Sequence, residues 1–119
     1  DGGLSDPIPI DFAIKKGCEK IVVIWTKPIN EVGNYKIDEM AGHALKKKYP
    51  NISNDLLNRK EKIEKSLEYA KKLRNEGKVL IVSPESIGKM STLTKDKEAL
   101  DMLYKKGYAD AEKIIEFLK

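Results

Sequence analysis

The sequence predicts an α/β fold on three observations. Two short runs, residues 21–25 and 79–82, are apolar at every position and rich in β-branched side chains. Such runs are typical of strands that are covered on both faces of a parallel sheet. A long segment with helical spacing of apolar residues separates them, and a second helical segment follows the last run. We therefore expect two parallel strands, joined by a right-handed helical crossover and covered by helices.

The first 28 residues are expected to hold a loop, a short helix and the first strand. The loop carries the tripeptide Asp1-Gly2-Gly3 at its start. A short helix is predicted from about Ile10, and Gly17 ends it, because glycine readily adopts the left-handed conformation after a helix. The strand of residues 21–25 follows and ends before residues 27–28.

Two helices are predicted within residues 37–76. The first covers residues 37–49 and ends before Pro50, and the second is capped by Ser53 or Asn54 and runs to about residue 76. Gly77 then ends the second helix. Its apolar positions form one stripe along the helix: Leu56, Ile63, Leu67, Ala70 and Leu73.

The second strand is expected within residues 78–83, and closing helices within residues 94–118. Thr94 is predicted to cap the first of these helices and Gly107 to break it, so that a last helix covers residues 108–118. Its inward positions are expected to be Ala111, Ile114, Ile115 and Leu118. Residues 27–36 and 84–93 are predicted loops.

No linker or repeat divides the 119 residues, which are therefore expected to form a single unit, residues 1–119. Two strands alone make a poor sheet, because both outer edges remain unpaired. We therefore expect this unit to be part of a larger α/β domain.

The charge pattern argues against a nucleic-acid partner. The net charge is +4, but lysine carries almost all of it, and Arg59 and Arg74 are the only arginines. Nucleic-acid readers more often combine arginine with exposed aromatic residues. The one dense cluster, Lys46-Lys47-Lys48, is interpreted as a solvated helix end. No apolar run approaches the roughly 20 residues that span a bilayer, and we expect a cytoplasmic protein in peripheral contact with membrane.

Most chemistries have no motif here. The sequence lacks a Gly-x-Ser-x-Gly elbow, a phosphate-binding glycine loop, a dinucleotide fingerprint and a Cys-x-x-Cys pair. We predict neither a metal site nor a cofactor, because the lone His43 and the lone Cys18 cannot form a zinc site together. His43 is expected to be structural or solvent-facing, and Cys18 to pack as an inert small residue.

The tripeptide Asp1-Gly2-Gly3 remains as the candidate site. By itself it is typical of a turn. Paired glycines also let a chain approach another group closely, so they can present a neighbouring carboxylate.

Residues 1–28, DGGLSDPIPIDFAIKKGCEKIVVIWTKP, resemble the C-terminal part of the patatin-like phospholipase family, in particular its bacterial members. These proteins carry Asp-Gly-Gly, a Pro-Ile-Pro-like segment, a short helix ending in glycine, and an apolar strand. The resemblance continues at Arg59, where bacterial members have an arginine opening the long helix, at EGKVLIVSPE, and at the pattern Tyr-x-x-Gly-Tyr-x-Asp-Ala of residues 104–111.

The resemblance implies an α/β hydrolase variant that cleaves lipid esters with a Ser-Asp dyad. Asp1 would be the general base, and Gly2 and Gly3 would support its turn. The serine nucleophile of the family lies upstream of the aspartate, in a Gly-x-Ser-x-Gly elbow that this sequence lacks. The resemblance thus implies an upstream N-terminal part as partner, a lipid ester as substrate, and an isolated piece without activity.

Two alternatives remain open from the residues alone. One is a non-catalytic α/β binding module, which could form a homodimer by pairing its exposed strand edges. The other is a binder of anionic membranes or nucleic acid that uses Lys46-Lys47-Lys48 and further helix lysines.

Overall fold

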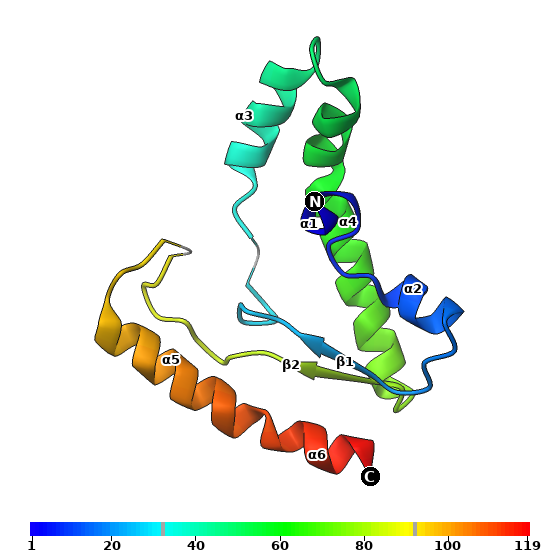
Figure 1. Cartoon of the computed structure of the whole chain (residues 1–119), viewed down its shortest axis with the longest axis vertical. Coiled ribbons are helices and arrows are strands. Elements are labelled where there is room, and N and C mark those ends of the chain that lie inside the picture. The colour runs from blue at the N-terminus through cyan, green and yellow to red at the C-terminus, as the bar shows by residue number, and fades with distance from the viewer. Residues whose placement is uncertain (32, 92) are drawn as a thin grey trace.

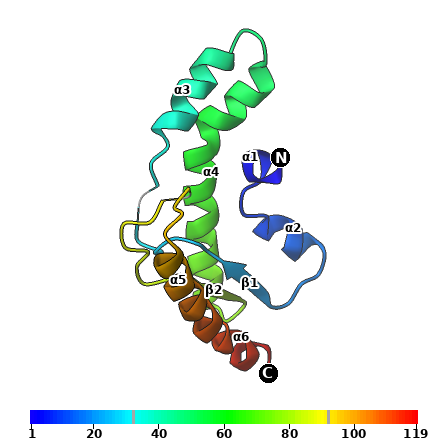
Figure 2. The ribbon, with the colours of Figure 1, turned by 60° about the vertical axis from the view of Figure 1, so that its left-hand side comes forward.

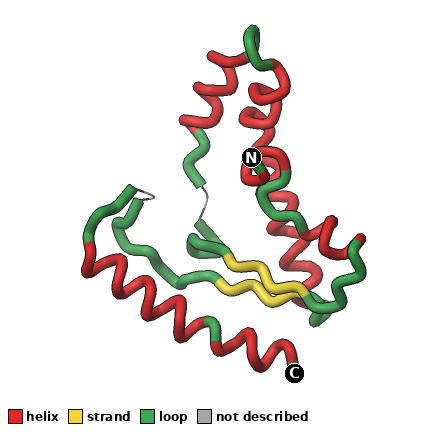
Figure 3. The backbone as a smooth tube through the Cα atoms, in the orientation of Figure 1, coloured by secondary structure: helices red, strands yellow, loops and turns green. Residues whose placement is uncertain are grey.

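The computed structural model describes residues 1–31, 33–91 and 93–119. Positions 32 and 92 of the two predicted loops lie outside the described residues. Six helices and two strands occur in the order α1, α2, β1, α3, α4, β2, α5, α6 within the described ranges (Figures 1 and 3). Their bounds are Gly2–Ser5, Ile10–Lys15, Ile21–Ile24, Lys36–Leu45, Pro50–Asn75, Val79–Val82, Lys97–Asp110 and Glu112–Leu118.

The two strands pair in parallel, as predicted, with Ile21 opposite Val79 and Ile24 opposite Val82. They form one two-stranded sheet in the part of the chain that the structure describes. Val23 and Val79 are buried, but the side chain of Ile24 is 71% exposed. The prediction that the first strand is covered on both faces is therefore wrong at Ile24, the last residue of β1, which borders an apolar cavity at the strand ends.

The core lies where α4 crosses the sheet. Its buried apolar residues are Ile8, Ile10, Val23, Ile63, Ala70, Leu73 and Val79. Three of them belong to the stripe predicted on the long helix, and the other stripe residues, Leu56 and Leu67, are half-buried. The predicted inward face of α4 is thus confirmed. α4 packs against β2, and the end-to-end rod of α5 and α6 runs along another side of the same strand (Figures 1 and 2).

The helical hairpin of α3 and α4 differs from the prediction at its turn. α3 ends at Leu45, and α4 begins directly at Pro50. Proline suits the first turn of a helix, because its missing N–H has no helical partner there. Ser53 is therefore not a cap: it lies inside α4, is buried, and its Oγ donates a hydrogen bond to the carbonyl oxygen of Gly42 at 2.7 Å.

The two predicted glycine stops are confirmed, since Gly17 and Gly77 adopt φ of 81° and 74° after α2 and α4. The closing helices differ from the prediction. Asp96, not Thr94, caps α5, and its carboxylate accepts bonds from the amides of Glu98 and Ala99. Gly107 does not break the helix, because α5 continues to Asp110.

The predicted inward set of the last helix is largely wrong. Ile114 is half-buried, but Ala111 is exposed, and Ile115 and Leu118 are 64% and 56% exposed. The rod has apolar residues on two sides, and only one side faces β2. None of the helices in the described residues is long and apolar enough to cross a bilayer.

Candidate functional site: the Asp-Gly-Gly segment on the long helix

Asp1-Gly2-Gly3 forms a helix start rather than the predicted loop. The Asp1 carboxylate caps α1 by accepting a hydrogen bond from the Gly3 amide at 3.0 Å. The amides of Leu4 and Ser5 donate to the backbone carbonyl of Asp1. Aspartate is among the strongest N-cap residues, and neither glycine adopts a positive φ. The glycines therefore supply no unusual backbone conformation here.

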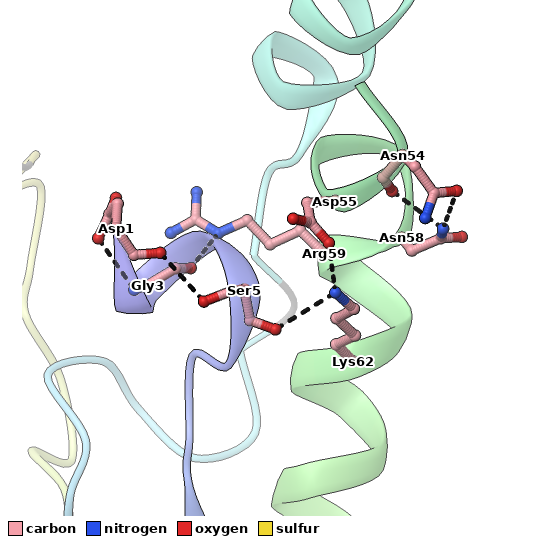
Figure 4. A network of polar contacts seen from close by, with 8 residues as sticks. All are labelled: Asp1, Gly3, Ser5, Asn54, Asp55, Asn58, Arg59 and Lys62. Atoms are coloured by element: carbon pink, nitrogen blue, oxygen red, sulfur yellow. Dashed lines mark hydrogen bonds and ion pairs between the residues drawn. The ribbon is translucent and has the colours of Figure 1, made fainter. Parts of the chain in front are cut away.

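Arg59 of α4 holds this short helix in place. Its Nε donates to the carbonyl oxygen of Gly3 at 3.1 Å, and its Nη1 pairs with Oδ2 of Asp38 on α3 at 3.1 Å. Figure 4 shows the guanidinium reaching from α4 to α1. One side chain thus connects three helices, and it fixes the backbone two residues from the Asp1 carboxylate.

Lys62 adds a second link one turn further along α4. Its Nζ donates to the carbonyl oxygen of Ser5 at 3.3 Å and pairs with Asp55 at 2.7 Å (Figure 4). A four-residue helix has little stability of its own. The contacts of Arg59 and Lys62 therefore account for the docking of α1.

The Asp1 carboxylate itself is exposed and accepts one hydrogen bond, from Gly3, among the described atoms. The nearest hydroxyl on α1 belongs to Ser5, and it donates to the backbone carbonyl of Asp1 rather than to the carboxylate. Ser5 is therefore not poised as a nucleophile for this base. The carboxylate is open to solvent on the surface of α1.

Tyr35 lies near the same cluster. Partial burial raises the pKa of its phenol, and the nearby Arg59 opposes that shift, whereas Glu64 and Asp38 add to it. The ring also packs tightly over Gly33, where a Cβ atom would lie 2.8 Å from ring atoms. Tyr35 thus joins the polar cluster to the apolar core.

The sequence contains two other reactive side chains, His43 and Cys18, and the structure confirms the predicted environment of only one of them. His43 is exposed on α3, which confirms the expected solvent-facing position. Cys18 is exposed rather than packed, so the prediction of burial is wrong. Cys18 directly follows Gly17, whose positive φ changes the direction of the chain between α2 and β1. The described residues hold no cluster of His, Cys, Asp or Glu with the geometry of a metal site.

Arg59 also lies elsewhere on α4 than expected. The resemblance predicts that Arg59 opens the long helix, but α4 begins at Pro50, so Arg59 lies in its interior. The sequence patterns did not predict that Arg59 contacts Asp38 and Gly3. They also did not predict that Lys62 contacts Ser5. No local pattern signals them, because the partners are far apart in the sequence.

An apolar cavity of about 210 Å³ lies apart from Asp1, at the carboxyl ends of both strands. Its walls come from the strand ends and from α5 and α6, including Ile24, Trp25, Val82, Leu103 and Ile114. The indole Nε1 of Trp25 is buried without a hydrogen-bond partner among the described residues. The cavity and the Asp1 carboxylate are two separate features of the chain.

The geometry defines a small α/β chain with two parallel strands, crossed by one long helix and closed by a helical rod. Residues 49–119, more than half of the chain, match the family described as Domain of unknown function (DUF6363). The chain belongs to this family. The matched part covers α4, β2, α5 and α6, and Asp1-Gly2-Gly3 lies outside it.

No curated protein matches the chain. No solved structure matches it either.

Proposed function

We propose that this chain is the C-terminal portion of a patatin-like serine acyl hydrolase, in which Asp1 is the general base of a Ser-Asp dyad. The proposal rests on the sequence resemblance and on one structural observation. The Asp1 carboxylate is exposed, while the backbone beside it is anchored to α4 through Arg59. An anchored but accessible carboxylate is what a base needs when its nucleophile comes from another part of the protein.

In the proposed reaction, the upstream part supplies the serine. Asp1 takes the proton from the serine hydroxyl as its oxygen attacks the ester carbonyl of a lipid. The proton then passes to the leaving alcohol, and an acyl-enzyme remains. Water, activated by the same carboxylate, hydrolyses the acyl-enzyme and regenerates the serine. The chain alone has the base and no nucleophile in this scheme, so it is inactive by itself.

The free outer edges of β1 and β2 in the described sheet support an upstream partner. A parallel sheet of two strands is expected to continue into further strands, and the exposed Ile24 lies on this incomplete sheet. The hydrolase fold, contact with membrane and a cytoplasmic location remain parts of the proposal.

The test is Asp1→Asn in the protein that carries this chain together with the proposed serine. Asparagine caps a helix about as well as aspartate, so the substitution removes the base and keeps the cap of α1. We expect ester hydrolysis to fall by about 10²- to 10⁴-fold, with unchanged thermal unfolding. Asp11→Asn, at an exposed aspartate on α2, is the matched control and should keep full activity.

Two results would overturn the proposal. One is full activity of Asp1→Asn. The other is an encoding gene without a Gly-x-Ser-x-Gly sequence upstream of Asp1.

A second candidate is a non-catalytic α/β module that dimerises. The observation that favours it is the exposed apolar surface of the closing helices.

A further inference from the structure

The rod of α5 and α6 has a second apolar face. Its inner face, turned toward β2, holds the half-buried residues Leu103, Asp110, Ile114 and Phe117. About 100° around the helix from this face runs another apolar line, which we name the outer stripe: Leu100, Tyr104, Tyr108, Ala111, Ile115 and Leu118. Its members are spaced four, four, three, four and three residues apart, which is the repeat of one helix face.

The large residues of the outer stripe are 44% to 72% exposed, and Ala111 between them borders the apolar cavity at the strand ends. Tyr104 and Tyr108 are 70% and 72% exposed, and their rings lie side by side with centroids 6.5 Å apart. A helix with two apolar faces is normally buried on both. A contiguous exposed apolar patch of this kind is typical of a protein interface.

We propose that the outer stripe is the interface through which two copies of this chain form a symmetric, antiparallel helix pair. The proposal goes beyond the hydrolase function and does not depend on it. It differs from pairing at the strand edges, because it uses α5 and α6 and leaves β1 free.

The stripe is complementary to itself. When a two-fold axis passes midway between Tyr108 and Ala111, the large Tyr108 of one copy faces the small Ala111 of the other. In the same register, Tyr104 faces Ile115, and Leu100 lies within one residue of Leu118. The central pair thus sets a large side chain against a small one, and the outer pairs set apolar side chains against each other, as an isologous two-fold interface requires.

The charges beside the stripe are complementary in the same register. In this register Lys105 lies within two residues, along the helix axis, of Glu112 of the second copy, and Asp101 lies within one residue of Lys119, so the long side chains of both pairs can meet. Within one copy, Asp101 and Lys105 are already paired at 2.6 Å on the exposed surface. In an antiparallel pair these charges form an alternating row across the interface, as flanking charges do in coiled coils.

The first test compares two glutamate variants of the 119-residue chain by sedimentation equilibrium. Tyr108→Glu places a carboxylate in the middle of the stripe, and it should raise the dimer dissociation constant by at least about tenfold. Met102→Glu is the matched control, since Met102 lies on the same helix, is 70% exposed, and is off the stripe. It should leave the dissociation constant unchanged. Circular dichroism checks that both variants keep their helices.

Ile115→Glu, at 64% exposed on α6, is a second variant on the stripe in case Tyr108→Glu does not fold. A chain that stays monomeric throughout the micromolar range overturns the proposal. So does a dimer that neither stripe variant weakens, or that Met102→Glu weakens equally, since another surface would then hold the two copies together.

The second test reverses the charges. Lys105→Glu should weaken the dimer by about two- to tenfold, because the new carboxylate of each copy then lies near Glu112 of the other copy. Adding Glu112→Lys to the same chain should restore the original dissociation constant. A double variant that is weaker than the single one would contradict the antiparallel register.

Discussion

The hydroxyl of Ser53 donates a hydrogen bond to the carbonyl oxygen of Gly42 at 2.7 Å, and it does so where α3 and α4 touch. Both residues are buried. A Cβ atom on Gly42 would lie 2.8 Å from Cγ of Leu57 and 3.3 Å from the carbonyl oxygen of Ser53. The helical hairpin is therefore joined at this point by close backbone approach and one buried polar contact.

We expect Gly42→Ala to destabilise the chain by about 1–3 kcal/mol, because the added methyl group overlaps the Leu57 side chain. The free energy of unfolding, from urea denaturation, measures the effect. Gly107→Ala is the matched control: it too lies inside a helix, and a Cβ there meets nothing within 4 Å. It should stabilise by about 0.5–1 kcal/mol through helix propensity. Effects of the same sign at both glycines would contradict the close approach.

Ser53→Ala should cost about 1 kcal/mol of stability, because it removes the buried hydrogen bond to Gly42 and leaves a small void. Ser66→Ala, a half-buried serine on the same helix, is the comparison. It should be neutral or slightly stabilising, since alanine has the higher helix propensity. Equal losses at the two serines, measured by urea denaturation, would show that the contact with Gly42 contributes nothing.

The strands and the long helix could be predicted from the sequence, because each is encoded by residues that lie close together in the chain. β-branched runs define β1 and β2, and the spacing of Ile63, Ala70 and Leu73 fixes the inward face of α4. Local patterns misplaced the start of α4, because the preference of proline for a first helical turn competes with the capping preference of Ser53. Ser53 instead makes a tertiary contact, its hydrogen bond to Gly42 of α3, which a local pattern does not encode.

The inner face of the closing helices was mispredicted for another reason. The rod of α5 and α6 carries two apolar stripes, and periodicity alone cannot tell which one meets the sheet. For the candidate site, the sequence singled out Asp1 but expected a loop around it. The anchoring by Arg59 joins segments 56 residues apart, and no local propensity encodes a contact of that range.

Arg59→Met should release α1 from α4 without unfolding the rest of the chain. The substitution removes the bonds to Gly3 and Asp38 and keeps an unbranched side chain of similar length. Hydrogen exchange should become faster at the amides of Leu4, Ser5 and Asp6, which close the turn of α1. Arg59→Lys tests whether a single charge suffices; because lysine cannot present the guanidinium fork, we expect it to restore only part of the protection.

The Arg59–Asp38 pair should contribute only modestly to global stability. Its side chains are 34% and 21% exposed, so solvent screening limits the coupling to about 0.2–1 kcal/mol. A double-mutant cycle with Asp38→Asn and Arg59→Met measures this coupling. A coupling energy of several kcal/mol would mean that the pair stabilises the whole fold and not only the docking of α1 on α4.

Cys18 should react with a thiol reagent in the folded chain, because its side chain is exposed after α2. Ellman's reagent added without denaturant should titrate one thiol, in agreement with the single cysteine of the sequence. Cys18→Ser is the control and should give no signal. Reaction only after denaturant is added would contradict the exposed position and favour the packed one expected from the sequence.

The carboxyl group of Asp110 should titrate below the usual range of aspartate. Its hydrogen bond with Lys113 lowers the pKa of Asp110, and the charge of Lys106 acts in the same direction, while burial opposes them. A pKa that is lower in the folded state than in the unfolded state adds stability above the ordinary pKa. This contribution fades as the pH falls through the lowered folded value. A carboxyl-detected NMR titration measures the pKa directly, and Lys113→Gln should move it upward, toward the usual range. An unchanged pKa in that variant would show that Lys113 is not the partner that holds the junction of α5 and α6.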